Sequence, residues 1–411
     1  MLAGTVFATL ALLGLSASDP SGLRYYSLGI SAGLANSSVY CIRQDSRGLM
    51  WFGTFGGLSR WDGETFTTWR PRPDQASLSA SVIFSLMEGD GCLWVATDGG
   101  GLSRFDMVTE GWSTWRADPA DPGRLSSDRV FALGRDAEGR IWAGSADGVV
   151  NILDPKSGKV LRLWPPDVSG GDRVPASPVR CIARTLDGTM WVGTEGSGLI
   201  EVTPGLRAIG HTHEAGNPAS LGSDTVRSLL VDSKGRLWIG LGNGSVDLRS
   251  GAGFEHASLP PGGAPRQAVR ALGEDDSGTI WVGWAEAGIG TIDPGTGALS
   301  LPGPQGAANV RALYRDRSGL MWAGLKDGGA RAYNPRSAAF SRHETMVDGT
   351  RLRGLRGLAE THDGKILAGT DGLGLVELDR RDGSVRTVPA ARPCSSPMSR
   401  GRSPWQGSWA G

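Results

Sequence analysis

One phrase that returns eight times constrains this chain more than any other feature. DSKGRLWIGLGNG (232–244) has counterparts such as DSRGLMWFGTFGG, GDGCLWVATDGGG and HDGKILAGTDGLG. One slot holds tryptophan in seven copies and Leu367 in the eighth, at spacings of 41 to 49 residues. The seven tryptophans are Trp51, Trp94, Trp142, Trp191, Trp238, Trp281 and Trp322. Eight copies in phase indicate an array of one structural unit.

Each unit reads as four short β-strands. An apolar run (226–232) leads into a turn and then into a second run (237–240). A glycine-rich turn precedes a third strand (101–106 in the second unit), and an aromatic-tipped fourth strand follows (66–69 in the first). Helical repeats need long segments of 3.6-residue periodicity, whereas this chain has 64 glycines, 23 prolines and short β-rich runs. Four antiparallel strands per unit predict an all-β propeller of radially arranged blades.

The fixed residues of the unit have physical roles. A glycine three residues before the tryptophan slot, as at Gly235, is expected to adopt positive φ in the first turn. The aspartate that starts this turn, as at Asp232, is expected to hydrogen-bond the turn backbone. The tryptophan is expected to fill the wedge between blades, and the small residue two positions later lets backbones approach. The repeated phrase is therefore predicted to be structural.

The ends of the array suggest how the ring closes. Residues 23–30 (LRYYSLGI) have fourth-strand character but precede any first strand, so we expect them to complete the last blade. Seven blades are expected over 23–345, with the repeat at 346–388 starting a second propeller or, alternatively, adding an eighth blade. Residues 389–411 have no strand periodicity and are interpreted as an unstructured or out-of-frame tail. Residues 1–18 contain an apolar run that is typical of a signal peptide, which predicts export.

Composition excludes several classes of function. Arginine and lysine number 42, as do aspartate and glutamate, and this balance argues against a nucleic-acid partner. The four cysteines have no zinc or redox spacing, and HTH (211–213) is a weak metal candidate beside a strand end, so no metal and no cofactor are expected. None of these residue types points to catalysis.

The first unit, residues 33–69, resembles the opening repeat of two-component regulator propellers. The matching residues are Asn36, Val39, Asp45, Gly48, Trp51, Gly53, Thr54, Gly57, Leu58, Arg60, Asp62 and Phe66, with Trp61 and Trp69 at the family's tyrosines. The resemblance recurs over residues 23–388. It implies a periplasmic sensor propeller, membrane-anchored in a full-length parent and lacking here its histidine kinase or diguanylate cyclase output. It leaves open a homodimer formed through downstream domains.

A ligand site is expected at one mouth of the central channel, near the start of each innermost strand. The second residue of each first strand should lie there: Tyr40, Phe131, Arg180, Arg227, Arg270, Arg311 and Arg356, with Phe84 less securely aligned. Arginine forks suit carboxylate or sulfate, and aromatic faces suit sugar rings, so an acidic saccharide or another small anion is the expected ligand. The alternative is that each arginine pairs with an acidic residue of a neighbouring blade and serves packing alone.

Three classes of function remain from the sequence. The first is a signal-input propeller that binds a ligand and is not itself an enzyme. The second is a sialidase-like glycosidase, which would need an arginine triad, a tyrosine nucleophile and a carboxylic acid, whereas only Tyr40 of five tyrosines falls at the mouth. The third is a free-standing propeller that binds a protein partner.

Overall fold

The computed structural model describes eleven stretches of the chain. They are residues 17–18, 24–118, 120–163, 177–257, 265–301, 308–335, 346–347, 350–351, 355–370, 374–378 and 385–388. The remainder of the signal-like segment and the tail at 389–411 lie outside them. The chain divides into two compact units, Met1–Ala339 and Phe340–Gly411.

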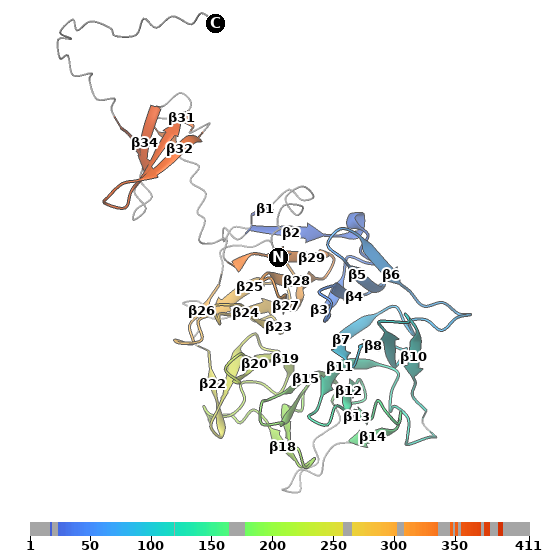
Figure 1. Ribbon diagram of the computed structural model, residues 1–411. Helices are drawn as coiled ribbons and strands as arrows, with labels where there is room; N and C mark the ends of the chain where they lie inside the picture. The colour runs from blue at the N-terminus through green and yellow to red at the C-terminus, as the bar shows by residue number, and fades with distance from the viewer. Residues whose placement is uncertain are drawn as a thin grey trace, which may run out of the picture. The chain divides into compact units, whose positions relative to one another are not determined.

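The first unit is a ring of seven antiparallel sheets, which we number as blades 1 to 7 in chain order (Figure 1). Blade 1 contains β3 (Val39–Gln44), β4 (Met50–Thr54), β5 (Gly57–Trp61) and β6 (Phe66–Trp69), and blade 2 contains β7 (Ile83–Gly89), β8 (Cys92–Thr97), β9 (Leu102–Asp106) and β10 (Trp112–Trp115). Blade 3 contains β11 (Val130–Arg135), β12 (Ile141–Ser145), β13 (Val150–Leu153) and β14 (Val160–Leu163). Blade 4 contains β15 (Val179–Arg184), β16 (Met190–Thr194), β17 (Leu199–Val202) and β18 (Ala208–His211).

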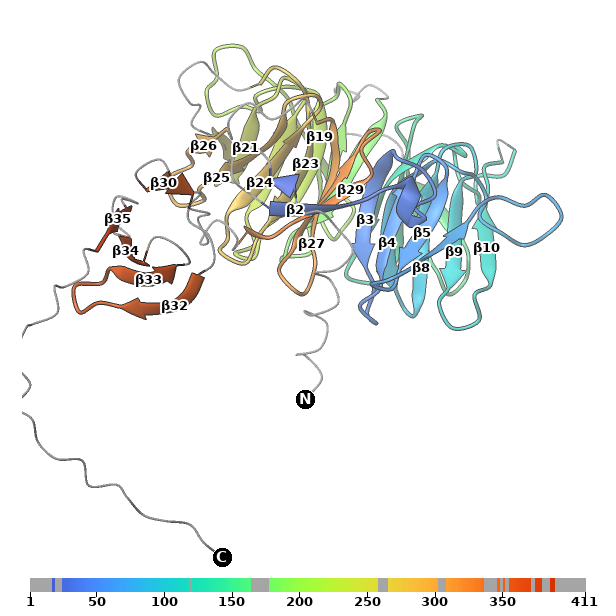
Figure 2. The same cartoon turned by 90° about the horizontal axis from the view of Figure 1, so that it is seen from above.

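The remaining blades repeat this order. Blade 5 contains β19 (Val226–Val231), β20 (Leu237–Leu241), β21 (Val246–Ser250) and β22 (Gly253–His256). Blade 6 contains β23 (Val269–Glu274), β24 (Ile280–Trp284), β25 (Gly288–Ile292) and β26 (Leu299–Ser300). Blade 7 contains β27 (Val310–Arg315), β28 (Met321–Leu325) and β29 (Ala330–Tyr333). The first strand of each blade lies innermost in the ring (Figure 1), and Figure 2 shows the blades from above. The predicted four-stranded unit is confirmed.

The N-terminal strand completes blade 7. The strand β2 (Arg24–Leu28) pairs antiparallel with β29, with Tyr25 opposite Tyr333 and Leu28 opposite Ala330. The short β1 (Ala17–Ser18) pairs with β2, and a 3₁₀ turn η1 (Ile30–Ala32) leads into blade 1. Strand β27 lies beside β3, and this contact joins the last blade to the first. The expected closure by the first strand is therefore confirmed.

A tryptophan wedge occupies each of the seven interfaces between blades. The hydrophobic core consists of seven clusters, each shared by two neighbouring blades and each containing one of the seven repeat tryptophans. All seven side chains are at most 5% exposed. Since a buried tryptophan removes on the order of 150–250 Å² from water, these residues supply much of the adhesion between blades. The predicted wedge role is confirmed.

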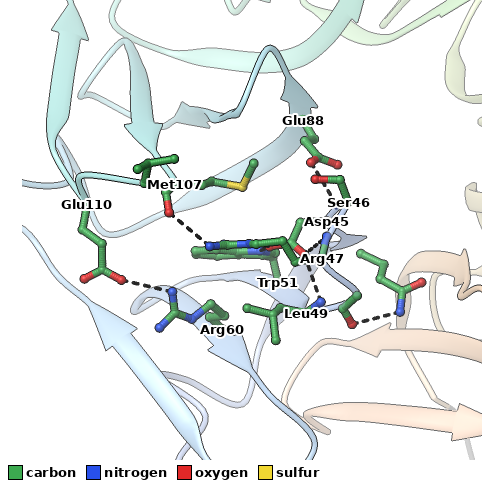
Figure 3. Close-up of polar contacts among 12 residues, drawn as sticks. Asp45, Ser46, Arg47, Leu49, Trp51, Arg60, Glu88, Met107 and Glu110 are labelled. Atoms are coloured by element: carbon green, nitrogen blue, oxygen red, sulfur yellow. Dashed lines mark hydrogen bonds and ion pairs between the residues drawn. The ribbon is translucent and has the colours of Figure 1, made fainter. Parts of the chain in front are cut away.

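The turn aspartate binds both its own backbone and the tryptophan of its repeat. In blade 1, Oδ1 of Asp45 accepts from the amides of Arg47 and Leu49 at 3.0 Å, and Oδ2 accepts from Nε1 of Trp51 at 2.9 Å (Figure 3). The indoles of four other repeats donate in the same way to Asp136, Asp232, Asp275 and Asp316. The glycine of every repeat has positive φ, between 73° and 95°. Both expectations for this turn are confirmed, and the indole bond adds to them.

The small residue after each tryptophan lies against the next blade. Gly240, for example, lies where an added Cβ would come within 2.5 Å of Val269 in blade 6. The same close approach to the first residue of the next inner strand occurs at Gly53, Gly144, Gly193, Gly283 and Gly324, and Ala96 takes the position in blade 2. A small residue at this position, glycine in six blades and alanine in blade 2, therefore allows the close spacing between blades.

The second unit contains the eighth repeat. Strands β32 (Leu355–Glu360), β33 (Ile366–Thr370), β34 (Gly374–Leu378) and β35 (Val385–Thr387) form a four-stranded sheet, and β30 (Met346–Val347) pairs with β31 (Thr350–Arg351). This sheet belongs to the second unit. Within the described stretches of both units, no helix has the length and hydropathy of a membrane span.

Candidate functional site

Every inner strand of the ring carries a β-bulge at its second residue. In blade 5, Val226 pairs with Leu241 and Ser228 pairs with Gly240, so Arg227 is an extra residue without a partner across the ladder. The same register shift occurs in the other six blades. A bulge bends the strand and redirects the side chain of the extra residue. Seven such side chains line the mouth of the channel, and we call them the inner ring: Tyr40, Phe84, Phe131, Arg180, Arg227, Arg270 and Arg311.

Aromatic rings form one arc of this inner ring. Tyr40 and Phe84 have ring centroids 5.2 Å apart, and Phe84 and Phe131 have centroids 5.0 Å apart, both in edge-to-face geometry. The guanidinium carbon of Arg180 lies 4.4 Å from the Phe131 centroid, and that of Arg311 lies 5.5 Å from the Tyr40 centroid. Cation–π contacts therefore join both ends of the aromatic arc to the arginine arc, and the inner ring is continuous.

One carboxylate neutralises the first half of the arginine arc. Nε of Arg180 donates to Oε2 of Glu195 at 2.6 Å, and Nη2 of Arg227 donates to Oε1 at 2.6 Å. Burial raises the pKa of Glu195, but the hydrogen bonds and charges of the two arginines outweigh burial, and the pKa lies below its ordinary value. Glu195 is therefore ionised and holds both arginines in place at neutral pH.

The second half of the arc has no such partner. Among the described residues, neither Arg270 nor Arg311 forms an ion pair. The buried Nε of each has no hydrogen-bond acceptor, and the same holds for Nε of Arg227. Burial, followed by the charges of Arg311, Arg227 and Arg180, lowers the pKa of Arg270 to about 10. Arg270 thus stays charged at neutral pH in a site where positive charge is unfavourable. Such a site attracts an anion.

A second set of seven residues explains which arginines are neutralised. Each of these rim residues donates its backbone amide to the carbonyl that immediately precedes the inner strand of its own blade, which places them at equivalent positions. In blade order they are Phe55, Asp98, Ala146, Glu195, Gly242, Ala285 and Lys326. Only Asp98 and Glu195 are acidic, and Asp98 pairs with Arg129 at 2.7 Å. The rim of blades 5 to 7 therefore offers no carboxylate to Arg270 or Arg311.

The inner ring opens into a cavity of about 400 Å³. Residues further along the inner strands, up to the fifth, also line it, including Cys41, Cys181 and Tyr314. Burial raises the pKa of the Cys181 thiol to about 12, so this thiol is protonated and unreactive at neutral pH. The described residues that line the cavity include no histidine, aspartate or glutamate.

The structure brings together six of the seven site residues predicted from the sequence. The seventh, Arg356, is in β32 of the second unit, and its side chain lies outside the described residues. Phe84, aligned less securely because its turn is one residue shorter, occupies the inner ring between Tyr40 and Phe131. Glu195 was missed, although it stands at the same repeat position as Asp98 and could have been found by alignment of that position. The binding role of these residues stays a prediction.

The histidines of HTH (211–213) have structural contacts. His211 Nε2 lies 3.0 Å from Glu201, its ring stacks on Trp191, and His213 Nδ1 lies 2.8 Å from the carbonyl oxygen of Leu221. Among the described residues no group of three or more potential ligands is arranged to hold a metal ion. Both histidines lie on or beside the outermost strand of blade 4, away from the channel.

Comparison with known families matches two parts of this ring. Residues 33–56 and 220–243, in blades 1 and 5, match the model of the family described as "Two component regulator propeller". Two of its repeats therefore resemble two-component regulator propeller repeats. It is also 28% identical over 193 residues to Histidine kinase P4 of Formosa agariphila, an alignment that covers 46% of this chain and 14% of that kinase.

Solved structures share the fold. The extracellular domain of a B. thetaiotaomicron protein described as a hybrid two component system is 20% identical, with a TM-score of 0.65 over 87% of this chain and 48% of that one. A second extracellular domain from the same organism, described as part of a one component system, gives 18% and 0.60 over 88% and 47%. A catalytically inactive virginiamycin B lyase from Staphylococcus aureus gives 12% and 0.60 over 76% and 99%. The chain thus spans about half the length of the two extracellular domains.

Proposed function

We propose that this chain is the ligand-binding input module of a bacterial signal-transduction protein, and that it works in the periplasm. The two-component regulator repeats and the likeness to extracellular domains of signalling systems support this role. The signal-peptide character of residues 1–18 is consistent with export. The parent protein would couple the propeller to a histidine kinase or a diguanylate cyclase.

The observation that carries the proposal is the inner ring of bulged residues. Three aromatic side chains and four arginines line one mouth, and a single glutamate compensates only two of the arginines. Aromatic side chains bind sugar rings, and arginines bind carboxylate or sulfate. Tyr40 and Phe84 are half-buried, and Phe131 is buried. The ligand is therefore an acidic saccharide or a chemically similar small anion.

The lining of the cavity favours binding over catalysis. The lyase that shares this fold is described as inactive after replacement of one histidine. The described lining of the cavity here has no histidine or carboxylate to act as general acid or base. A sialidase-like reaction needs a carboxylic acid beside the tyrosine, and Tyr40 has only aromatic and arginine neighbours in the inner ring.

A thermal-shift screen with acidic and neutral oligosaccharides tests the proposal. Because a ligand that binds only the folded state raises the unfolding temperature, at least one acidic saccharide should stabilise the protein while its neutral counterpart does not. Arg311→Gln should remove this shift. Arg315→Gln is the matched control, since Arg315 is on the same strand but forms an exposed ion pair with Asp276 at 2.9 Å. Absence of any shift across the acidic panel, with the folded state confirmed by circular dichroism, would refute the proposal.

A further inference from the structure

We infer that the ligand presents one anionic group to this mouth, and that this group binds between Arg270 and Arg311 rather than across the whole arginine arc. The inference rests on the proposed function and specifies the chemistry of the same site. It divides four arginines at equivalent positions into a pair that binds the ligand and a pair that Glu195 already occupies.

The first step is the geometry around Glu195. Its two carboxylate oxygens accept separately, Oε2 from Arg180 and Oε1 from Arg227. Arg180 is further fixed by its stacking on Phe131 at 4.4 Å. A ligand anion that approached this pair would meet an existing carboxylate and would have to displace it. Binding there is therefore electrostatically disfavoured.

The second step is the rim of the opposite side. A glutamate at a rim position reaches the arginine of its own blade and that of the next blade, as Glu195 does in blades 4 and 5. For Arg270 and Arg311 the corresponding rim position is Ala285, which carries no charge, and the next one is Lys326. Arg270 and Arg311 therefore have no rim carboxylate as a partner and can pair with an anion from the ligand.

The third step concerns the edge that each guanidinium presents. A carboxylate binds an arginine through two parallel N–H groups of the guanidinium fork. Nε is buried without an acceptor in Arg227, Arg270 and Arg311 alike, but Arg227 already donates through Nη2 to Glu195, whereas Arg270 and Arg311 form no ion pair among the described residues. The repulsion among neighbouring arginines that depresses the Arg270 pKa would be relieved by the incoming charge. Both arginines are thus arranged to receive a planar carboxylate.

The fourth step is the neighbour on the aromatic side. Arg311 lies over the ring of Tyr40, at 5.5 Å, so the free arginine pair adjoins the start of the aromatic arc. A sugar ring that bears its own carboxylate satisfies both contacts at once, with the carboxylate on the arginines and the ring face on Tyr40. The ligand class is consequently a saccharide with a single uronic acid residue at the bound end.

Titration calorimetry on the 411-residue chain with three disaccharides tests the inference. The probes are a disaccharide with one terminal uronate, the neutral disaccharide with a hexose in its place, and a di-uronate. The neutral probe should bind at least about 10-fold more weakly than the mono-uronate, which corresponds to about 1.4 kcal/mol. Arg270→Gln and Arg311→Gln should each weaken mono-uronate binding by about 10-fold or more, whereas Arg315→Gln and Arg180→Gln should change it less than about 3-fold.

Two charge exchanges at the rim give an independent arm. Ala285→Glu places a carboxylate where Arg270 and Arg311 are unpaired, and it should weaken mono-uronate binding by about 10-fold or more while the unfolding temperature holds. Glu195→Gln frees the other pair and should raise the affinity for the di-uronate relative to the mono-uronate by about 10-fold.

The outcomes separate the inference from the proposed function. If Arg180→Gln weakens binding as much as Arg270→Gln, or if Ala285→Glu leaves affinity unchanged, the division of the arc is wrong although the propeller still binds an acidic saccharide. If the folded protein binds none of the three disaccharides and no other acidic saccharide, the proposed function fails, and the inference fails with it.

Discussion

At the scale of single residues, Asp232 links a turn to a tryptophan wedge. Its carboxylate is almost completely buried and accepts from the backbone amides of Lys234 and Arg236, from Nε of Arg236 and from Nε1 of Trp238. Asp232→Ala leaves the buried indole N–H and the partly buried donors of Lys234 and Arg236 without this acceptor, and we expect it to lower the free energy of unfolding by about 3 kcal/mol. Equilibrium unfolding in urea measures this loss.

Blade 4 supplies a natural control for this substitution. Thr185 takes the place of the aspartate there, and its hydroxyl accepts from Nε1 of Trp191 at 3.3 Å. Asp232→Thr should therefore retain the indole bond and cost less than Asp232→Ala. Equal losses for the two variants would show that the indole bond contributes nothing measurable.

The same carboxylate makes stability depend on pH. Burial alone would raise the pKa of Asp232, but hydrogen bonds from Trp238 and Arg236 hold it below the ordinary value, and Asp45 and Asp136 are lowered in the same way. A carboxylate with a depressed folded-state pKa stabilises the protein above its unfolded pKa of about 3.9, and the stabilisation disappears as the pH falls through the lower folded value. The stability gap between wild type and Asp232→Thr should therefore narrow between pH 6 and about pH 2.5. Urea unfolding at each pH measures the difference in the free energy of unfolding between the two proteins. A difference that stays constant over this range would show that the charge of Asp232 does not contribute to stability.

At the scale of strands and turns, the features that recur with the repeat could be predicted from the sequence. The features that depend on the register between strands could not. Tryptophan, glycine and aspartate recur at fixed spacing, so the four strands and the wedge could be predicted nearly to the residue. The inner-strand bulge could not, because it depends on which residue faces which across β19 and β20. Of the pairing that the packing alternative expects, the structure has Arg227 paired with Glu195 of the neighbouring blade and Arg180 paired with Glu195 of its own blade. Among the described residues Arg270 and Arg311 form no ion pair, and sequence reasoning missed this division because it depends on rim residues from other repeats.

The spacing between blades depends on the small residue two positions after each tryptophan, which is glycine in six of the seven blades. An added Cβ at Gly240 would contact Ser228 of its own blade and would approach Val269 of the next blade to 2.5 Å. Because φ at Gly240 is not positive, the penalty of Gly240→Ala is steric rather than conformational. We expect a loss of about 1–3 kcal/mol, seen as a lower unfolding temperature in calorimetry. Gly369→Ala is the control, since an added Cβ at the same repeat position of the second unit meets no atom within 4 Å. Equal effects of the two changes on the ring's unfolding would contradict the steric explanation.

At the scale of the whole ring, stability depends on a strand from the opposite end of the sequence. Strand β2 adds four pairings to β29, and its side chains join two blades: Tyr26 lies edge-on to Trp322 at 5.3 Å and also near Trp61. Without β2, blade 7 has an unpaired edge and the interface between blades 7 and 1 loses a large aromatic side chain. Closure of the ring is thus a property of residues about 300 apart in sequence.

Two truncations test this closure. A chain that begins at residue 29 lacks β2, whereas a chain that begins at residue 23 keeps it and serves as the control. Loss of a packed aromatic residue alone costs about 3–5 kcal/mol, so the shorter chain should unfold about 10 °C lower. A synthetic peptide of residues 23–30, added in excess, should restore part of the difference because it binds only the folded ring. If the two chains unfold within about 2 °C of each other, β2 does not hold the ring closed. If the shorter chain is destabilised but the peptide has no effect, β2 acts only as part of the continuous chain, and the open edge of β29 is not a binding site for a free strand.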